Sequence, residues 1–141
     1  MIRAALALVL VVASPAAAME LRLPAGARVT AERATDPDVY AAPIAAYGDG
    51  SVPTVVLEGP VARTAWEIPT PSITPLQIMR PLRTQLEDAG FRIVLDCAAE
   101  TCGGFDFRFE IETLPGPGMY VNIRNYHFVT ALRGPQEAPV L

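Results

Sequence analysis

The chain has 141 residues, with eleven arginines, fifteen carboxylates and no lysine, and its formal net charge is −4 at pH 7. An acidic chain without a basic cluster is not expected to bind nucleic acid, because phosphates require concentrated Arg or Lys. Without lysine, Schiff-base chemistry and a lysine-containing phosphate loop are excluded. The length fits one globular domain.

Residues 1–18 have the pattern of a cleavable export signal. Arg3 supplies a positive start, residues 4–12 form an unbroken apolar run, and three alanines at 16–18 suit a signal peptidase. The run is too short for a permanent membrane helix, so a retained anchor is the weaker alternative. We expect a mature periplasmic chain from Met19, compatible with association with the outer membrane. Its ten arginines and fifteen carboxylates give a net charge of −5.

The region before residue 69 carries strand signals of unequal strength. Weak signals lie at 21–23 and 27–31 within an Ala-, Pro- and Asp-rich stretch. Stronger signals lie at 54–58 and 61–68, and the intervening Gly59-Pro60 predicts a hairpin turn. Trp66 is placed on one face of this hairpin, facing either the core or a ligand.

One helix is predicted after Thr74. Apolar residues repeat at helical spacing, namely Leu76, Met79, Leu82 and Leu86. Thr74 and Gln77 have the spacing of a capping box, and Pro75 suits the first turn. Ala89-Gly90 marks the end. Pro81 is expected to kink the helix or to confine its regular part to residues 80–89.

After the helix the apolar pattern changes to period two, which predicts strands. The expected strands are 91–96, 105–112, 119–123 and 126–132. Residues 114–118 are expected to form a rigid loop and residues 134–141 a linker-like tail. We therefore predict one α+β domain over residues 19–133, with a mainly antiparallel sheet and one principal helix packed on one face.

Cys97 and Cys102 are expected to form a disulfide. The compartment is oxidising and the closed loop is short. A redox-active pair is the alternative, but the spacing is not C-x-x-C, and no helix start is expected after the pair to lower a thiol pKa. Two thiols and one distant histidine do not complete a tetrahedral metal site, so no metal or cofactor is expected.

Other chemically capable side chains have ordinary structural interpretations. The alternating Phe105, Phe107 and Phe109 are expected to form a core face, or else to line an apolar groove. The single histidine, His127, fits a half-exposed sheet position better than a catalytic one. Two serines are expected in loops and have no nucleophile elbow around them, namely Ser51 and Ser72. Four carboxylates are expected at the solvated surface, namely Glu87, Asp88, Glu110 and Glu112.

Three segments together resemble a known family region. They are the helix end Leu82–Phe91, the C-x4-C-Gly-Gly-Phe-Asp-Phe-Arg-Phe stretch at 97–109, and the Leu-Pro-Gly-Pro-Gly-Met-Tyr-Val-Asn run at 114–122. This combination resembles the amino-terminal periplasmic region, of unknown function, of alphaproteobacterial outer-membrane protein A (OmpA) family proteins. The resemblance covers residues 19–133. It implies a linker and a peptidoglycan-binding OmpA-like module downstream.

The residues up to Leu141 do not include the Asn-x-x-Leu-Ser-x-x-Arg-Ala helix that carries peptidoglycan recognition in that module, so no direct peptidoglycan binding by this chain alone is expected. We expect a non-catalytic structural or interaction domain of the cell envelope. Its partner would be an envelope protein or a downstream OmpA-like module. Two alternatives stay open: a periplasmic carrier or sensor of an apolar ligand, and a thiol–disulfide enzyme that uses Cys97 and Cys102.

Overall fold

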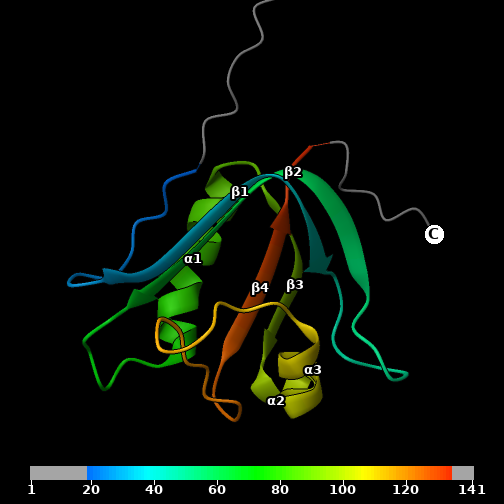
Figure 1. Ribbon diagram of the computed structural model, residues 1–141. Helices are drawn as coiled ribbons and strands as arrows, with labels where there is room; N and C mark the ends of the chain where they lie inside the picture. The colour runs from blue at the N-terminus through cyan, green and yellow to red at the C-terminus, as the bar shows by residue number, and fades with distance from the viewer. Residues whose placement is uncertain (1–18, 135–141) are drawn as a thin grey trace, which may run out of the picture.

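The computed structural model describes residues 19–134, so the expected export signal and residues 135–141 of the expected tail lie outside the described part. The elements are, in chain order, β1 (Arg28–Pro43), β2 (Thr54–Glu67), α1 (Pro75–Asp88), β3 (Arg92–Ala98), α2 (Ala99–Cys102), α3 (Gly104–Glu110) and β4 (His127–Leu132). The strands form two separate antiparallel pairs, β1–β2 and β3–β4 (Figure 1). The α+β class is confirmed, but the single sheet we expected is divided in two.

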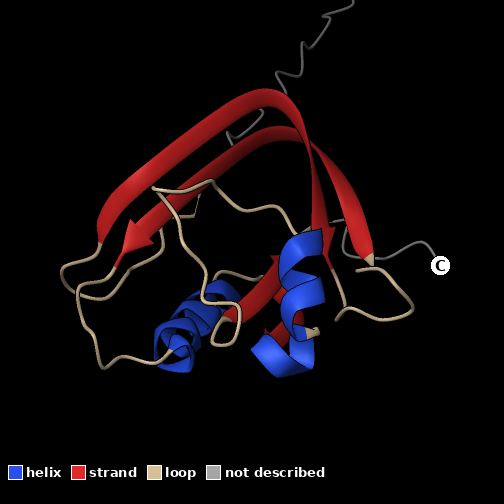
Figure 2. Cartoon of the chain, turned by 60° about the horizontal axis from the view of Figure 1, so that its bottom comes forward, coloured by secondary structure: helices blue, strands red, loops and turns tan. Residues whose placement is uncertain are grey.

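The first pair is a long ribbon that bends sharply in the middle (Figure 2). The register shifts between Thr35 and Asp38, opposite Gly59 and Val61, so β1 carries an extra residue at this point. Such a bulge bends the strand that contains it. The bent ribbon arches over the helices and the second sheet.

The hairpin predicted at Gly59-Pro60 is wrong. Both residues lie inside β2, and the chain reverses between Pro43 and Thr54 instead. Pro60 has no N–H, but proline is tolerated at a bulge or on an edge strand, and here it stands beside the bulge. The weak signal at 27–31 proved to be the start of a 16-residue strand.

The predicted helix is confirmed as α1. Thr74 and Gln77 form the expected capping box, and Pro75 occupies the first turn. Pro81 lies inside α1, and the helix runs through it from residue 75 to residue 88. The helix contacts both β3 and β4. No helix within residues 19–134 is long and apolar enough to cross a membrane.

Two of the four strands expected after α1 are confirmed, as β3 and β4, which pair with each other. The strand expected at 105–112 is wrong, because residues 104–110 form α3. The strand expected at 119–123 is also wrong, because these residues lie in turns and irregular chain. The disulfide-closed segment 97–102 therefore contains the end of β3 and the whole of α2, and it leads into α3. The expectation that no helix starts beside the cysteine pair is wrong.

Gly103 explains why the chain turns into a helix here. Its φ is +113°, a left-handed conformation that glycine adopts readily. A Cβ atom at this position would also lie 2.6 Å from the Cβ of Tyr47, so a larger residue does not fit. The helix that follows places Phe105 and Phe109 one turn apart on the same side, and Phe107 on the other.

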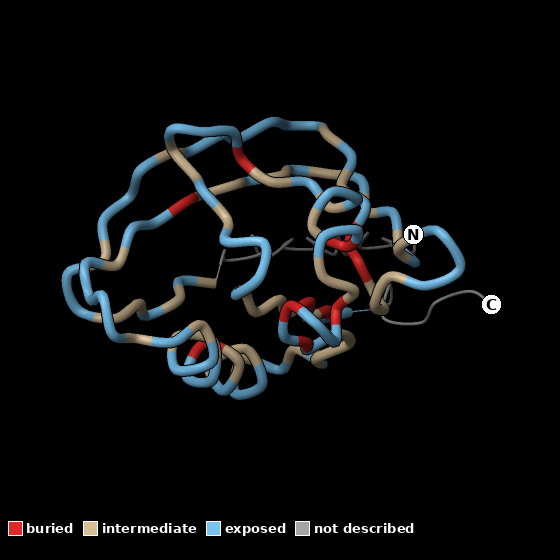
Figure 3. The backbone as a smooth tube through the Cα atoms, turned by 90° about the horizontal axis from the view of Figure 1, so that it is seen from below, coloured by how far each residue is buried: buried red, intermediate tan, exposed pale blue. Residues whose placement is uncertain are grey.

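The main core cluster forms where α2, α3, β3 and β4 meet. Cys97, Cys102 and Phe107 are buried, and Phe107 is 0% exposed. The ring of Phe107 packs edge-on against Phe128 of β4, with centroids 5.0 Å apart. Half-buried neighbours complete the cluster: Tyr47, Val52, Leu95, Ile111, Tyr126 and Phe128. Most of the ribbon, by contrast, is half-buried or exposed (Figure 3).

The different positions of the phenylalanines in α3 give a direct test of this core. Phe107→Ala should lower the free energy of unfolding by about 3–5 kcal/mol, because it empties a fully buried site. Phe109→Ala should lower it by less than about 1 kcal/mol, because that ring is mostly exposed. Urea denaturation followed by far-UV circular dichroism measures both, and equal losses would contradict the placement of α3.

The disulfide gives a second prediction. Alkylation of the denatured protein without reductant should leave Cys97 and Cys102 unmodified, because they are bonded to each other. Reduction should destabilise the protein by about 2 kcal/mol, the value expected for so short a closed loop. Denaturation with and without reductant measures this difference, and ready alkylation of unreduced protein would show that the bond is absent.

Candidate functional site

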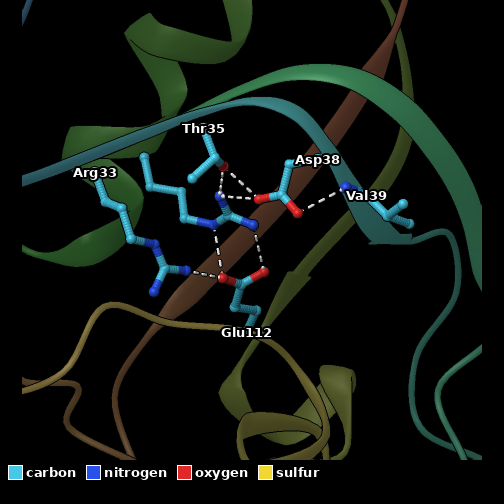
Figure 4. A network of polar contacts seen from close by, with 6 residues as sticks. Arg33, Thr35, Asp38, Val39 and Glu112 are labelled. Carbon is cyan, nitrogen blue, oxygen red and sulfur yellow. Dashed lines mark hydrogen bonds and ion pairs between the residues drawn. The ribbon is translucent and has the colours of Figure 1, made fainter.

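A network of charged side chains lies beneath the bend of the ribbon (Figure 4). Its centre is Arg63 of β2, whose side chain is only 13% exposed. Nη1 of Arg63 donates a hydrogen bond to Oδ2 of Asp38 at 3.2 Å, and Nη2 donates one to Oε2 of Glu112 at 3.0 Å. Arg63 therefore joins the bulge in β1 to the segment that follows α3.

Further contacts extend this network on both sides. Arg33 of β1 forms a second ion pair with Glu112. Asp38 accepts a hydrogen bond from the hydroxyl of Thr35 and another, at 2.8 Å, from the backbone N–H of Val39. Nε of Arg63 is buried and lies 2.6 Å from Oε1 of Glu112 in ion-pair contact, although its geometry is not that of a hydrogen bond.

The network favours the charged forms of Asp38 and Arg63. The hydrogen bonds from Thr35 and Val39, with the nearby Arg63, lower the pKa of Asp38 below its usual value. Hydrogen bonding to Glu112 and Asp38 raises the pKa of Arg63. Because the positive charges of Arg33 and Arg63 face the negative charges of Asp38 and Glu112, the cluster as a whole is neutral.

The segment after α3 is also fixed to the other half of the ribbon. The hydroxyl of Thr30 donates a hydrogen bond of 2.7 Å to the carbonyl of Gly118. A Cβ atom on Gly118 would lie 2.6 Å from the Cβ of Ala31, so glycine allows this close approach. Residues 112–120 are therefore held against the ribbon at both ends, by Glu112 and by Gly118.

Two adjoining cavities lie between β2 and residues 112–120, with volumes of about 440 and 430 Å³. We call them together the β2 trough. From the ribbon, every residue of 61–67 lines one cavity or the other, with Tyr40 and Thr30 of β1. The opposite wall consists of Glu112, Thr113, Leu114, Pro117, Gly118, Met119 and Tyr120. Thr64, Trp66 and Met119 line both cavities.

The trough suits an uncharged, mainly apolar ligand. Its charged side chains are all held in ion pairs, Arg63 with Glu112 and Glu67 with Arg28 of β1. Burial, together with the charge of Glu112, raises the pKa of Tyr40, so its phenol is neutral near pH 7. Trp66 is 45% exposed, which leaves much of a large apolar ring open to solvent. Volumes of this size lie within the usual range of small-molecule sites.

Of the site residues expected from the sequence, only Trp66 lines this trough. Cys97 and Cys102 are disulfide-bonded and buried, as the structural interpretation requires. Phe107 lies in the core. The expectation that the three phenylalanines share one face is wrong, because Phe105 and Phe109 point to solvent, 56% and 64% exposed. Their rings stack on each other with centroids 4.3 Å apart.

His127 forms a separate polar cluster on the second sheet. Its Nε2 lies 2.5 Å from Oδ1 of Asp96, and Arg83 of α1 forms an ion pair with the same carboxylate. Burial alone would raise the pKa of Asp96, but the hydrogen bonds from His127 and Arg83 outweigh it and lower this pKa. The cluster links α1, β3 and β4.

The remaining candidates are dispersed. Ser51 and Ser72 are exposed in turns, Glu87 and Asp88 are exposed near the end of α1, and Glu110 is exposed at the end of α3. Within residues 19–134, no three side chains of His, Cys, Asp or Glu lie together so as to hold a metal ion.

The sequence did not point to the Arg63 network. Arg63 is 25 residues from Asp38 and 49 from Glu112 in the chain, and no short motif joins them. Glu112 was expected on the solvent face of a strand. The available signal was weak: a single arginine within the otherwise apolar and small residues of 61–66.

The network predicts unequal effects for its two arginines. Arg63→Met should lower the melting temperature by roughly 5–10 °C, because it leaves two partly buried carboxylates without their cation. Arg33→Met should lower it by about 2 °C or less, because Arg33 is half exposed and surface pairs contribute little. Differential scanning calorimetry compares the two, and equal shifts would show that Arg63 is not the centre.

The Asp96 cluster predicts a dependence of stability on acid. Because the folded-state pKa of Asp96 lies below its unfolded value of 3.8, its contribution is present above pH 4 and is lost as the pH falls through the folded pKa. Asp96→Asn should therefore destabilise the protein at pH 7 and reduce the further loss of stability below pH 4. Urea denaturation at several pH values measures this, and an unchanged acid dependence would contradict the assignment.

Comparisons of the chain with protein-family models, with curated proteins and with solved structures found no match. The resemblance to the front region of OmpA-family proteins thus stays a prediction from the sequence.

Proposed function

We propose that this chain is a non-catalytic interaction domain of the periplasm and cell envelope, the front module of an OmpA-like protein. The export-signal pattern and the sequence resemblance support the location. The β2 trough is the observation that carries the proposed mode of action. Its charged side chains are held in ion pairs and the surface of its larger cavity is mainly apolar, which suits contact with a partner better than the transfer of a proton or a bond.

The second sheet supplies the rigid base in this proposal. We propose that α1 is the principal helix and covers one face of β3–β4, since it contacts both strands and its Arg83 is ion-paired with Asp96 of β3. The disulfide and the core around Phe107 stiffen the other end of the sheet. The ribbon and residues 112–120 are then free to form the contact surface.

A carrier or sensor of an apolar small molecule is the second candidate. The observation that favours it is the larger cavity, of about 440 Å³, which is bordered by Trp66, Leu114 and Met119. The groove considered from the sequence, between the helix and the three phenylalanines, is replaced by this one, because α3 turns Phe105 and Phe109 outward.

The proposal is tested on protein exported in a bacterial host with an outer membrane and taken from its periplasm. The intact mass should correspond to a chain that starts at Met19, and formaldehyde treatment of cells should link the domain to an envelope protein. Met119→Arg, which places a charge in the trough, should strongly reduce this product. Ile123→Arg, a matched exposed change outside the trough, should not.

Three results would contradict the proposal. The first is periplasmic protein that still carries residues 1–18. The second is a cross-linked product that both variants retain in full. The third is sedimentation of the purified chain with peptidoglycan sacculi, for which an isolated OmpA-like module is the positive control.

A further inference from the structure

We infer that the β2 trough receives an extended, uncharged peptide segment of a partner protein, which pairs with the free edge of β2 as a third strand. The inference rests on the proposed interaction function and specifies its site and the chemistry of the partner. It follows from the lining of the trough, from the hydrogen bonding of the ribbon and from the pairing of the charges.

The lining shows that the trough runs along the edge of the strand. Successive side chains of a strand point to opposite faces. Val61 and Arg63 nevertheless line the same cavity as Ala62 and Thr64, so this cavity reaches both faces of β2. The other edge of β2 is paired with β1. The cavity therefore includes the remaining edge of β2 and, because Tyr40 of β1 also lines it, extends beneath the ribbon.

This edge is long enough to bind a peptide strand. The seven residues 61–67 that line the trough span roughly 23 Å at the usual rise of a strand. In the described part of the chain, no backbone hydrogen bond joins 61–67 to residues 112–120 or to any segment other than β1. The opposite wall is thus near, but it does not use the backbone groups of the edge.

The ribbon itself also favours a third strand. A two-stranded sheet is at best marginally stable without a third strand or a helix packed on it. The ribbon has few contacts with the helices or with the second sheet, and Glu112 and Gly118 join residues 112–120 to it. Addition of a strand to an exposed edge is a common mode of peptide recognition.

The charges determine what kind of peptide fits. Because Arg63 is paired with Glu112 and Glu67 with Arg28, a charged peptide side chain would find no unpaired opposite charge among the residues that line the trough. Trp66, Leu114 and Met119 offer apolar surface. We therefore expect small apolar side chains at alternate positions of the peptide, since these face the walls while the peptide backbone pairs with β2.

The test uses a capped peptide, Ser-Val-Thr-Val-Thr-Val-Ser, and the fluorescence of the single tryptophan, Trp66, in the purified protein. The peptide should change this fluorescence in a saturable way. The same peptide with alternate backbone nitrogens methylated keeps its side chains but loses backbone N–H donors to β2. It should bind at least about tenfold more weakly than the unmethylated peptide. Equal binding of the two peptides would overturn strand pairing.

Variants and a small probe complete the test. Met119→Arg should abolish the response and Ile123→Arg should preserve it, with the fold of each checked by circular dichroism. Loss of binding in both variants, or in neither, would overturn the site. Saturable binding of the uncharged dye N-phenylnaphthylamine at Trp66, with no binding of either peptide, would overturn the peptide and favour the small-molecule carrier. Failure of all three probes would overturn this inference, whereas the cross-linked envelope product would still support the proposed function.

Discussion

The ion pairs of Arg63 are the interaction on which the arrangement of this protein depends. Arg63 stands at the bend of the ribbon and binds Asp38 in the bulge of β1 and Glu112 after α3. Without it, two partly buried carboxylates would face each other beneath the arch. Through these contacts one side chain joins β2, the bulge of β1 and residues 112–120.

This arrangement leaves the two halves of the molecule with different physical characters. The second sheet has a buried aromatic cluster, a disulfide and a helix in contact with it. The ribbon has no comparable core, and its large apolar residues Val39, Val56 and Trp66 are about half exposed or more. A well-packed base with a weakly packed, exposed ribbon is compatible with the proposed interaction function.

Patterns between residues close in the sequence correctly predicted α1 and the disulfide. The capping box at Thr74 and Gln77 and the repeat of leucines were sufficient for α1. The disulfide followed from the spacing of Cys97 and Cys102. The alternation in 105–112 was misleading because period two and a short helix share one feature: residues 105 and 109 fall on the same side in both. The close approach of Gly103 to Tyr47 and the packing of Phe107 against Phe128 favour the helix, and both are tertiary contacts that the local sequence pattern does not reveal. The site was mostly hidden for the same reason, since the sequence analysis named only Trp66 as a possible site residue and placed Glu112 on the solvent face of a strand.

A double-variant comparison tests the role of Arg63 most directly. The melting temperatures of Arg63→Met, Glu112→Gln and the variant with both changes are measured under the same conditions. If the two side chains act through each other, the double variant should melt no lower than the less stable single variant. If the two losses add in full, Arg63 and Glu112 act independently, and the contact does not hold the ribbon over residues 112–120.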